Sequence, residues 1–196
     1  MDDYSNNSIA PSPEDTEDFI LSCRYGDIDD LKSFVERFGT DSVGNARDEN
    51  GNTVLHMASA NGHTELLDVL LPIVPSTLLS AQNHAGSTAL HWAALNAQLG
   101  TARALIGFPA GPGADLIDIK NSAGRSPLGE AEAAGWDEGA KWMVEVMRLD
   151  DAGAAVGEEE GAEAQKEVRD ADGRVAHASL PAAFDMPDGG GEPASS

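Results

Sequence analysis

The stretch TALHWAALNAQLG at residues 88–100 decides the fold, because the chain contains a near copy of it. Thirty-five positions earlier, residues 53–65 read TVLHMASANGHTE, with Thr, Leu-His and Ala at the same offsets. Similar segments that recur every 20 to about 50 residues are typical of repeat proteins, in which each unit packs against the next. The repetition also raises a functional question, which is whether His56 and His91 perform chemistry or complete a structural unit.

Two weaker copies flank this pair. Three copies begin at Gly51, Gly86 and Gly124, with spacings of 35 and 38 residues, and the last one reads GRSPLGEAEAAGW. A degenerate copy, FILSCRYGDIDDLKSFV at residues 19–35, precedes them and lacks the Thr and Leu-His pattern. A terminal unit can lose such a pattern because one of its faces contacts water instead of another unit. The chain is therefore predicted to contain about four repeats.

Each repeat is expected to consist of a turn, a helix, a second turn and a second helix. Gly51 and Gly86 permit the positive φ angles of a tight turn. Thr53 and Thr88 can cap the free N–H groups at the start of the following helix. The run TELLDVLL at residues 64–71 supplies leucines at helical spacing, which are expected to pack against the neighbouring repeats.

The segments TVLHMA, TALHWA and SPLGEA resemble the TPLHxA motif of the ankyrin-repeat family. The resemblance covers about residues 14–148 and implies an all-α solenoid of about four repeats, built from turn–helix–turn–helix units. Two departures are Gly129 in place of the motif His and the long connection GFPAGPGAD at residues 107–115. Both predict a looser last repeat.

The composition of the chain changes outside this region. Residues 1–13 are predicted to form a disordered N-terminal segment, residues 14–148 the ankyrin-repeat domain, and residues 149–196 an acidic, mostly disordered tail. The tail has few large apolar residues and many Asp, Glu, Gly and Ala residues, so it cannot bury enough apolar surface to fold alone. One part of it, EEGAEAQKEVRDA at residues 159–171, is also compatible with a helix formed against a partner.

The chain carries 12 Lys and Arg residues against 34 Asp and Glu residues, which gives a formal net charge of −22. Such a charge repels nucleic acids and anionic lipids and attracts basic proteins. We therefore expect a basic protein partner, no direct contact with nucleic acid or membrane, and a monomeric chain. Cys23 is the only cysteine, so no intramolecular disulfide can form, which favours the reducing cytoplasm and nucleus.

The two equivalent histidines could form a metal pair or supply a catalytic base, or each could tie a turn to its helix. Stacked helices lie about 8–10 Å apart, whereas two nitrogens on one zinc ion each lie about 2.1 Å from it. His56 and His91 are therefore interpreted as structural residues. Cys23 is interpreted as a small buried residue, and GPGADL at residues 111–116 lacks the third Gly and the preceding strand of a dinucleotide site. No catalytic, cofactor or metal residue is expected, and the chain is not expected to be an enzyme.

The expected function is protein binding through the concave face, which hairpin tips and first helices form in such solenoids. Trp92, with Met57 and Leu95, is predicted to be an exposed apolar anchor. Acidic side chains are predicted to surround this anchor and to steer a basic segment toward it. These acidic residues are Asp15, Glu17, Asp18, Glu130 and Glu132. The predicted partner-binding residues are Tyr25, Glu49, Asn50, Asn52, Met57, Asn61, His84, Ser87, Trp92, Leu95, Asn96, Glu130 and Glu132.

A narrower resemblance rests on an ordered set of segments: GDIDDLK, LHMASANGHTE, GSTALHWAALNAQLG and EAEAAG, followed by the acidic tail. This set resembles the yeast and fungal ankyrin-repeat chaperones that escort a newly made, basic ribosomal protein of the small subunit. The resemblance implies binding of that client, protection from aggregation, and delivery for assembly of the 40S subunit. The alternative is a generic ankyrin adaptor or scaffold, which would show no preference for a basic client.

Overall fold

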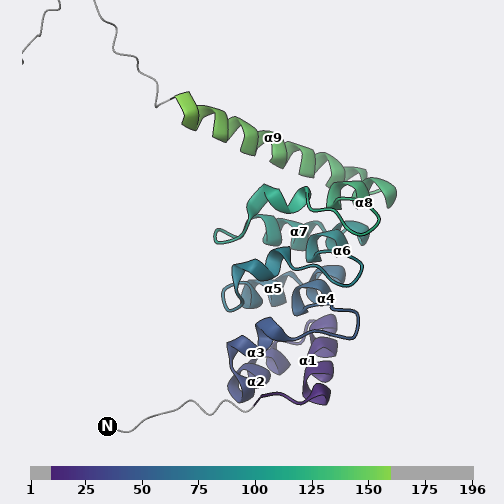
Figure 1. Ribbon diagram of the computed structural model, residues 1–196, viewed down its shortest axis with the longest axis vertical. Helices are drawn as coiled ribbons and strands as arrows, with labels where there is room; N and C mark the ends of the chain where they lie inside the picture. The colour runs from purple at the N-terminus through teal and green to yellow at the C-terminus, as the bar shows by residue number, and fades with distance from the viewer. Residues whose placement is uncertain (1–9, 160–196) are drawn as a thin grey trace, which may run out of the picture.

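The computed structural model describes the backbone of residues 10–159 and the side chains of residues 10–149. Within this range every regular element is helical, and Figure 1 shows the helices stacked in a column. The elements are α1 (Pro13–Tyr25), α2 (Ile28–Phe38), α3 (Thr40–Asn45), α4 (Val54–Ala60), α5 (Thr64–Leu70), η1 (Ser76–Ser80), α6 (Ala89–Leu95), α7 (Leu99–Ile106), η2 (Gly113–Ile117), α8 (Pro127–Ala133) and α9 (Asp137–Glu159). The predicted all-α solenoid of four helix pairs is confirmed.

The first helices of the four repeats form one layer, in which α4 packs between α1 and α6, and α6 packs between α4 and α8. The second helices lie behind them, where α5 contacts α7. Small residues allow the close approach, since Ala58, Ala93 and Ala131 are fully buried. In the layer of first helices α8 packs on α6 as α6 packs on α4, so no looser packing is observed there, whereas α9 packs on α8 and η2 rather than on α7 as α7 packs on α5.

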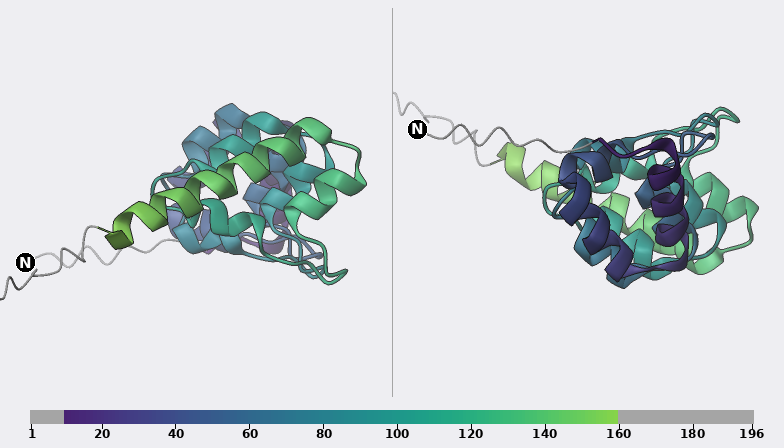
Figure 2. Two further views of the ribbon diagram at one scale, coloured as in Figure 1. Left: turned by 90° about the horizontal axis from the view of Figure 1, so that it is seen from above. Right: turned by 90° about the horizontal axis from the view of Figure 1, so that it is seen from below.

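Three hairpin loops project together from one side of the stack, as the end views in Figure 2 show. We call residues 48–52, 83–87 and 121–125 the first, second and third hairpin loops. Hydrogen bonds join their tips, because the N–H of His84 donates to the Asn50 carbonyl and the N–H of Ser122 donates to the Ala85 carbonyl, both at 2.9 Å. The loops therefore form a continuous ladder along the stack.

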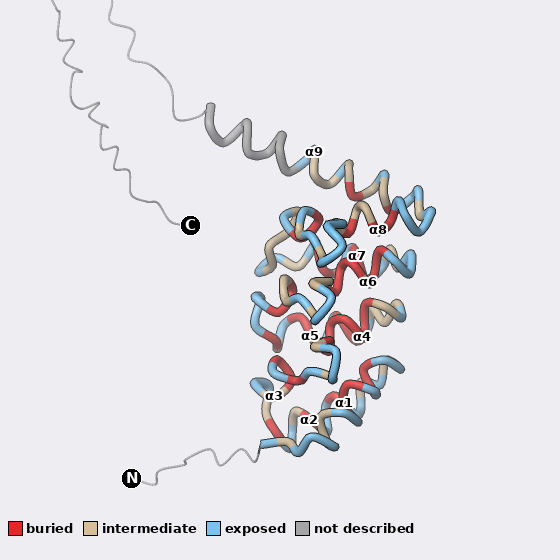
Figure 3. The backbone as a smooth tube through the Cα atoms, turned by 45° about the vertical axis from the view of Figure 1, so that its right-hand side comes forward, coloured by how far each residue is buried: buried red, intermediate tan, exposed pale blue. Residues whose placement is uncertain are grey.

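The core runs along the whole column between the two helix layers, and Figure 3 shows its buried positions on successive helices. Leu66, Leu67 and Leu70 of α5 are buried, as the spacing of the leucines predicts. Cys23 is fully buried at the α1 end of this core, and burial raises the pKa of its thiol to about 12. This thiol is protonated and inaccessible, which confirms that Cys23 is a structural residue.

The ends of the helical stack differ slightly from the predicted boundaries. α1 begins at Pro13 because Ser12 caps it: the Ser12 hydroxyl accepts the Asp15 N–H, and the Asp15 carboxylate accepts the Ser12 N–H, both at 3.1 Å. At the other end α9 continues to Glu159, beyond the predicted domain end at residue 148. The predictions for residues 1–9 and 160–196 lie outside the described residues, and the three-part division of the chain stays a prediction.

None of the helices described within residues 10–159 is long and apolar enough to cross a membrane.

Candidate protein-binding surface

The two motif histidines tie successive repeats together. Nδ1 of His56 accepts the N–H of Thr53 at 3.1 Å, so the ring proton lies on Nε2, which donates to the Ser87 carbonyl at 2.8 Å. His91 repeats the arrangement one unit later, with Thr88 at 3.1 Å and the Arg125 carbonyl at 3.1 Å. Each imidazole thus caps its own helix and also holds the hairpin loop of the next repeat.

Burial keeps both rings neutral. Desolvation lowers the pKa of His56 to about 4 and also lowers the pKa of His91. Both ring nitrogens of each histidine are engaged in hydrogen bonds, so neither ring is free to act as a base or a metal ligand. Among the residues the structure describes, no group of three His, Cys, Asp or Glu side chains could hold a metal ion. The structural interpretation of these histidines is confirmed.

The concave face lies between the first helices and the hairpin loops, and it contains two grooves. The first, which we call the central groove, has a volume of about 310 Å³. Its lining includes Asp48, Asn50, Asn52, Met57, Asn61, Trp92 and Asn96. The Trp92 ring is partly buried and stands edge-on to the His56 ring, with centroids 5.9 Å apart. Trp92 is therefore neither a core residue nor a freely exposed one.

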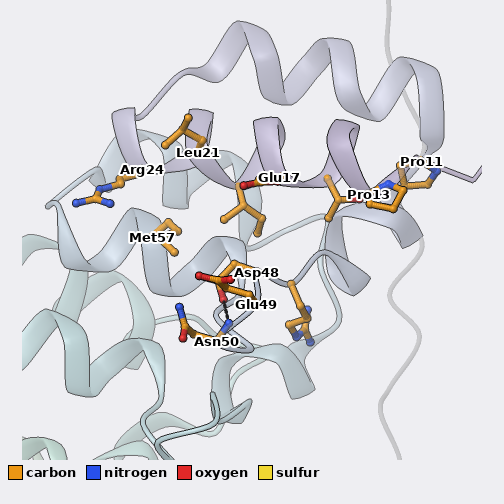
Figure 4. A pocket seen from close by; sticks show the side chains of 12 residues that line it. Pro11, Pro13, Glu17, Leu21, Arg24, Asp48, Glu49, Asn50 and Met57 are labelled. Atoms are coloured by element: carbon orange, nitrogen blue, oxygen red, sulfur yellow. Dashed lines mark hydrogen bonds between the residues drawn. The ribbon is translucent and has the colours of Figure 1, made fainter.

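The second groove, which we call the N-terminal groove, is larger at about 590 Å³ and lies between α1 and the first hairpin loop (Figure 4). Its apolar lining comes from Pro11, Pro13, Ile20, Leu21 and Met57, and its polar lining comes from Thr16, Glu17, Arg24, Arg47, Asp48, Glu49 and Asn50. It brings together three predicted binding residues, Glu49, Asn50 and Met57, but most of its α1 wall was not predicted.

Sequence reasoning missed Leu21 and Arg24 because the first repeat lacks the motif by which the other repeats are aligned. The signal was nevertheless present. Gly26 aligns with Gly62 at a spacing of 36 residues, and the same spacing places Leu21 at the position of Met57. Leu21, with 47% of its surface exposed, is thus the first member of a stripe that continues through Met57 and Trp92.

Two predicted binding residues are structural instead. Asn52 is buried, its amide group donates to Asp48 Oδ2 at 2.8 Å, and its oxygen accepts the side-chain N–H of Asn83 at 2.7 Å. Glu130 is also buried and accepts from Asn121 Nδ2 at 2.7 Å and Arg125 Nε at 3.0 Å. Their polar atoms stabilise hairpin loops, so the exposure that the prediction assumed is not observed for either side chain, although Asn52 still lines the central groove.

The predicted frame of acids is also corrected. Asp15 and Asp18 line a shallow pocket on the α2 side of α1, where Asp15 forms an ion pair with Arg37 at 3.2 Å. Hydrogen bonds from the Ser12 side chain and backbone, together with Arg37, hold the pKa of Asp15 below its usual value. Of the three acids on α1 predicted to frame the concave site, only Glu17 lines a groove.

The other predicted residues differ in how they relate to the two grooves. Met57 is 9% exposed, so it contributes a small apolar surface to both grooves rather than a projecting side chain. Exposed side chains that line neither groove are Tyr25, His84, Leu95 and Glu132, and Ser87 is half-buried. Their role in binding stays a prediction.

This stack of turn–helix–turn–helix units with an open concave face defines the class of protein. The chain belongs to the ankyrin-repeat family, because the family model for ankyrin repeats in three copies matches residues 19–118. The family, with the structural neighbour given below, indicates a protein-binding protein rather than an enzyme.

Two particular proteins are similar to it. A chain in the crystal structure of the yeast ribosomal protein Rps3 in complex with its chaperone Yar1 superposes with a TM-score of 0.64 and 30% identity, over 69% of this chain and 94% of that one. The ankyrin repeat-containing protein P16F5.05c of Schizosaccharomyces pombe is 38% identical over 68 residues, which are 35% of this chain and 45% of that protein. This chain thus matches less than half the length of the S. pombe protein.

Proposed function

We propose that this protein is a chaperone that binds a newly made, basic ribosomal protein of the small subunit, shields it from aggregation, and escorts it to 40S assembly. The observation that carries the proposal is the likeness to a chain of the Rps3–Yar1 complex, which extends over almost all of that chain. A protein-binding concave face with exposed acidic and apolar side chains supports it.

The charge of the chain supplies the physical reason. A ribosomal protein carries a surface that binds RNA phosphates, so before assembly it attracts other polyanions and aggregates with them. A chaperone with a net charge of −22 attracts that surface and is itself repelled by nucleic acid. Shielding is therefore a competition in which the chaperone occupies the basic surface first.

The test is complex formation between the purified full-length chain and purified yeast Rps3, measured by isothermal titration calorimetry. Lysozyme, a basic protein without a ribosomal role, is the matched control for charge alone. We expect a one-to-one complex with Rps3, little binding to lysozyme, and less light scattering when Rps3 is mixed with RNA in the presence of the chain. Equal binding to Rps3 and lysozyme, or to neither, would contradict the proposal.

The alternative is an ankyrin adaptor. The partly exposed Trp92 and Leu95, which is 55% exposed, could contact the partner of an adaptor equally well. Salt distinguishes the two functions. Association with a basic client slows as salt rises from about 50 to about 500 mM, because screening removes electrostatic steering. A preferred partner whose association rate does not change with salt would favour the adaptor.

The proposal also places the protein in the cytoplasm and nucleus as a monomer. A fluorescent fusion would show its location, and light scattering coupled to gel filtration would give its mass in solution.

A further inference from the structure

We propose that the N-terminal groove, rather than the central groove around Trp92, holds the anchoring segment of the client. We further propose that this segment carries one large apolar side chain with a Lys or Arg on one side of it only. The inference rests on the proposed function for the basic character of the client, and it adds where the client binds and in which orientation.

The N-terminal groove lies where the motif histidine is missing and where α1 begins about one turn earlier than the first helices of the next two repeats. In the second and third repeats, His56 and His91 hold the hairpin loop that follows. The equivalent position on α1 is Ile20, whose side chain cannot donate a hydrogen bond, and no hydrogen bond in the described structure joins α1 to the first hairpin loop. The space that the imidazole closes elsewhere is therefore open here, and Figure 4 shows α1 and the loop facing each other across it.

The floor of this groove is apolar. Ile20, which is 4% exposed, lines it together with Leu21 on α1 and Met57 on α4. At about 590 Å³ the space is nearly twice that of the central groove, so it accepts a Leu, Met or aromatic side chain together with its backbone. Apolar anchors that fill such a pocket dominate binding at protein interfaces.

Charge is distributed unevenly along the groove. Glu17 on α1 and Glu49 on the loop face the groove, and neither takes part in any ion pair found within residues 10–149. Asp48 differs, because its carboxylate already accepts three N–H groups of the hairpin loop. Arg47 also lines the groove, but its guanidinium donates to the Gly44 and Ala46 carbonyls, both at 2.8 Å, and forms no ion pair with either glutamate. The carboxylates of Glu17 and Glu49 therefore remain available to attract a cation.

Arg24 determines which way a charged client segment would lie in the groove. It lies seven residues after Glu17 on the same helix, which is about 10 Å along the axis, and Leu21 lies between the two (Figure 4). The second histidine of the second repeat, His63, fixes this end of α1 by donating to the Arg24 carbonyl at 2.8 Å. A cation is therefore attracted beside Glu17 and repelled beside Arg24, so a segment with cations on both sides of its anchor is disfavoured.

The first experiment uses the full-length chain and purified yeast Rps3 at about 50 mM salt, where charge effects are weakly screened. We expect Glu17→Lys to weaken binding about fivefold and Arg24→Glu to strengthen it about threefold, which lies within the range of exposed charge pairs. Glu36→Lys is the matched control, because it makes the same charge change on α2, away from both grooves. It should change affinity less than twofold.

A second pair of variants separates the two grooves. Leu21→Ala should weaken Rps3 binding about tenfold, and Trp92→Ala only about threefold. If wild-type chain binds Rps3 but Glu17→Lys matches Glu36→Lys, or Trp92→Ala exceeds Leu21→Ala, the inference is overturned while the proposed function stands.

The groove is also tested without Rps3, so that failure of the proposed function can be recognised separately. Four synthetic peptides carry one Phe with Lys on the N-terminal side, the C-terminal side, both sides or neither. NMR titration of the Ile20 and Leu21 methyl signals, which belong to this groove and not to the central one, should show one single-sided peptide binding tightest. Equal binding of the single-sided and double-sided peptides would refute the orientation, even if wild-type chain fails to bind Rps3.

Discussion

The junction between α1 and the first hairpin loop differs from the junction between α4 and the second loop at the position of the motif histidine. Ile20 occupies it in the first junction and His56 in the second. His56 closes its junction with hydrogen bonds to its own helix and to Ser87, whereas Ile20 leaves a groove of about 590 Å³. A repeat protein can thus form a groove at a junction where the motif histidine is absent and the first helix starts earlier.

The largest expected effect is a loss of folding stability in acid, where His56 at the closed junction must bind a proton. The folded-state pKa of His56 is about 4, below the ordinary value of 6.5, so the unfolded chain binds more protons between these pH values. Stability that is fully present above about pH 6.5 is therefore lost as the pH falls toward 4, by about 3 kcal/mol. Urea unfolding at several pH values measures this loss, and His56→Gln is the control, because its stability should fall less over the same range. If the free energy of unfolding fell equally with pH in the wild type and in His56→Gln, His56 would not titrate as its burial implies.

Removing the imidazole should destabilise the protein almost as much. His56→Ala loses the hydrogen bonds to Thr53 and Ser87, leaves a carbonyl without its partner and opens a cavity, which together cost about 2–3 kcal/mol. His84→Ala is the matched control, since His84 is exposed at a loop tip, and it should change the free energy of unfolding by less than about 0.5 kcal/mol. Equal effects of the two substitutions would argue against the closing role of His56.

Placing histidine in the open junction should not reproduce the closed one. α1 begins at Pro13, so the position equivalent to the cap Thr53 is Glu17, which lies inside the helix with its N–H already committed. Ile20→His would then bury an imidazole whose Nδ1 lacks its partner, which costs about 2 kcal/mol. The same urea titration tests it, and Leu21→His, at an exposed position on the same helix, is the control. A gain in stability would mean that the groove can be closed by one substitution.

The smallest effect is expected at the partly buried tryptophan. Trp92→Ala should leave the helix content unchanged in circular dichroism and weaken binding of Rps3 about threefold, or roughly 0.7 kcal/mol. Asn96→Ala, which removes a polar side chain from the same groove, serves as the comparison. Unchanged affinity for Trp92→Ala would remove the central groove from the binding surface.

Local patterns made most of the fold predictable. Thr53 and His56 are three residues apart and act on each other and on the next loop, so the repeat spacing alone indicates their role. The fold class, the leucine-rich second helices and the burial of Cys23 follow from similar short-range patterns. The start of α1 was harder, because Ser12 and Asp15 form a capping box in a segment whose composition resembles a loop.

The binding surface was less predictable because distant partners decide which polar side chains remain free. Asn52 stands at an exposed position in the family pattern, but Asn83, 31 residues away, takes its amide oxygen. The Glu130 carboxylate likewise accepts hydrogen bonds from Asn121 and Arg125. Leu21 was overlooked for the opposite reason, since nothing in its own repeat marks it.

The absence of the motif histidine at the first junction also bears on where a ligand would lie along the stack. A row of identical units would offer a long ligand several equivalent sites about 10 Å apart, and the ligand could slide from one to the next. The space between α1 and the first loop is nearly twice as large as the central groove beside it on the concave face. A polypeptide bound in the N-terminal groove, as we propose, would meet a different surface after a shift of one unit and would therefore be held in one register.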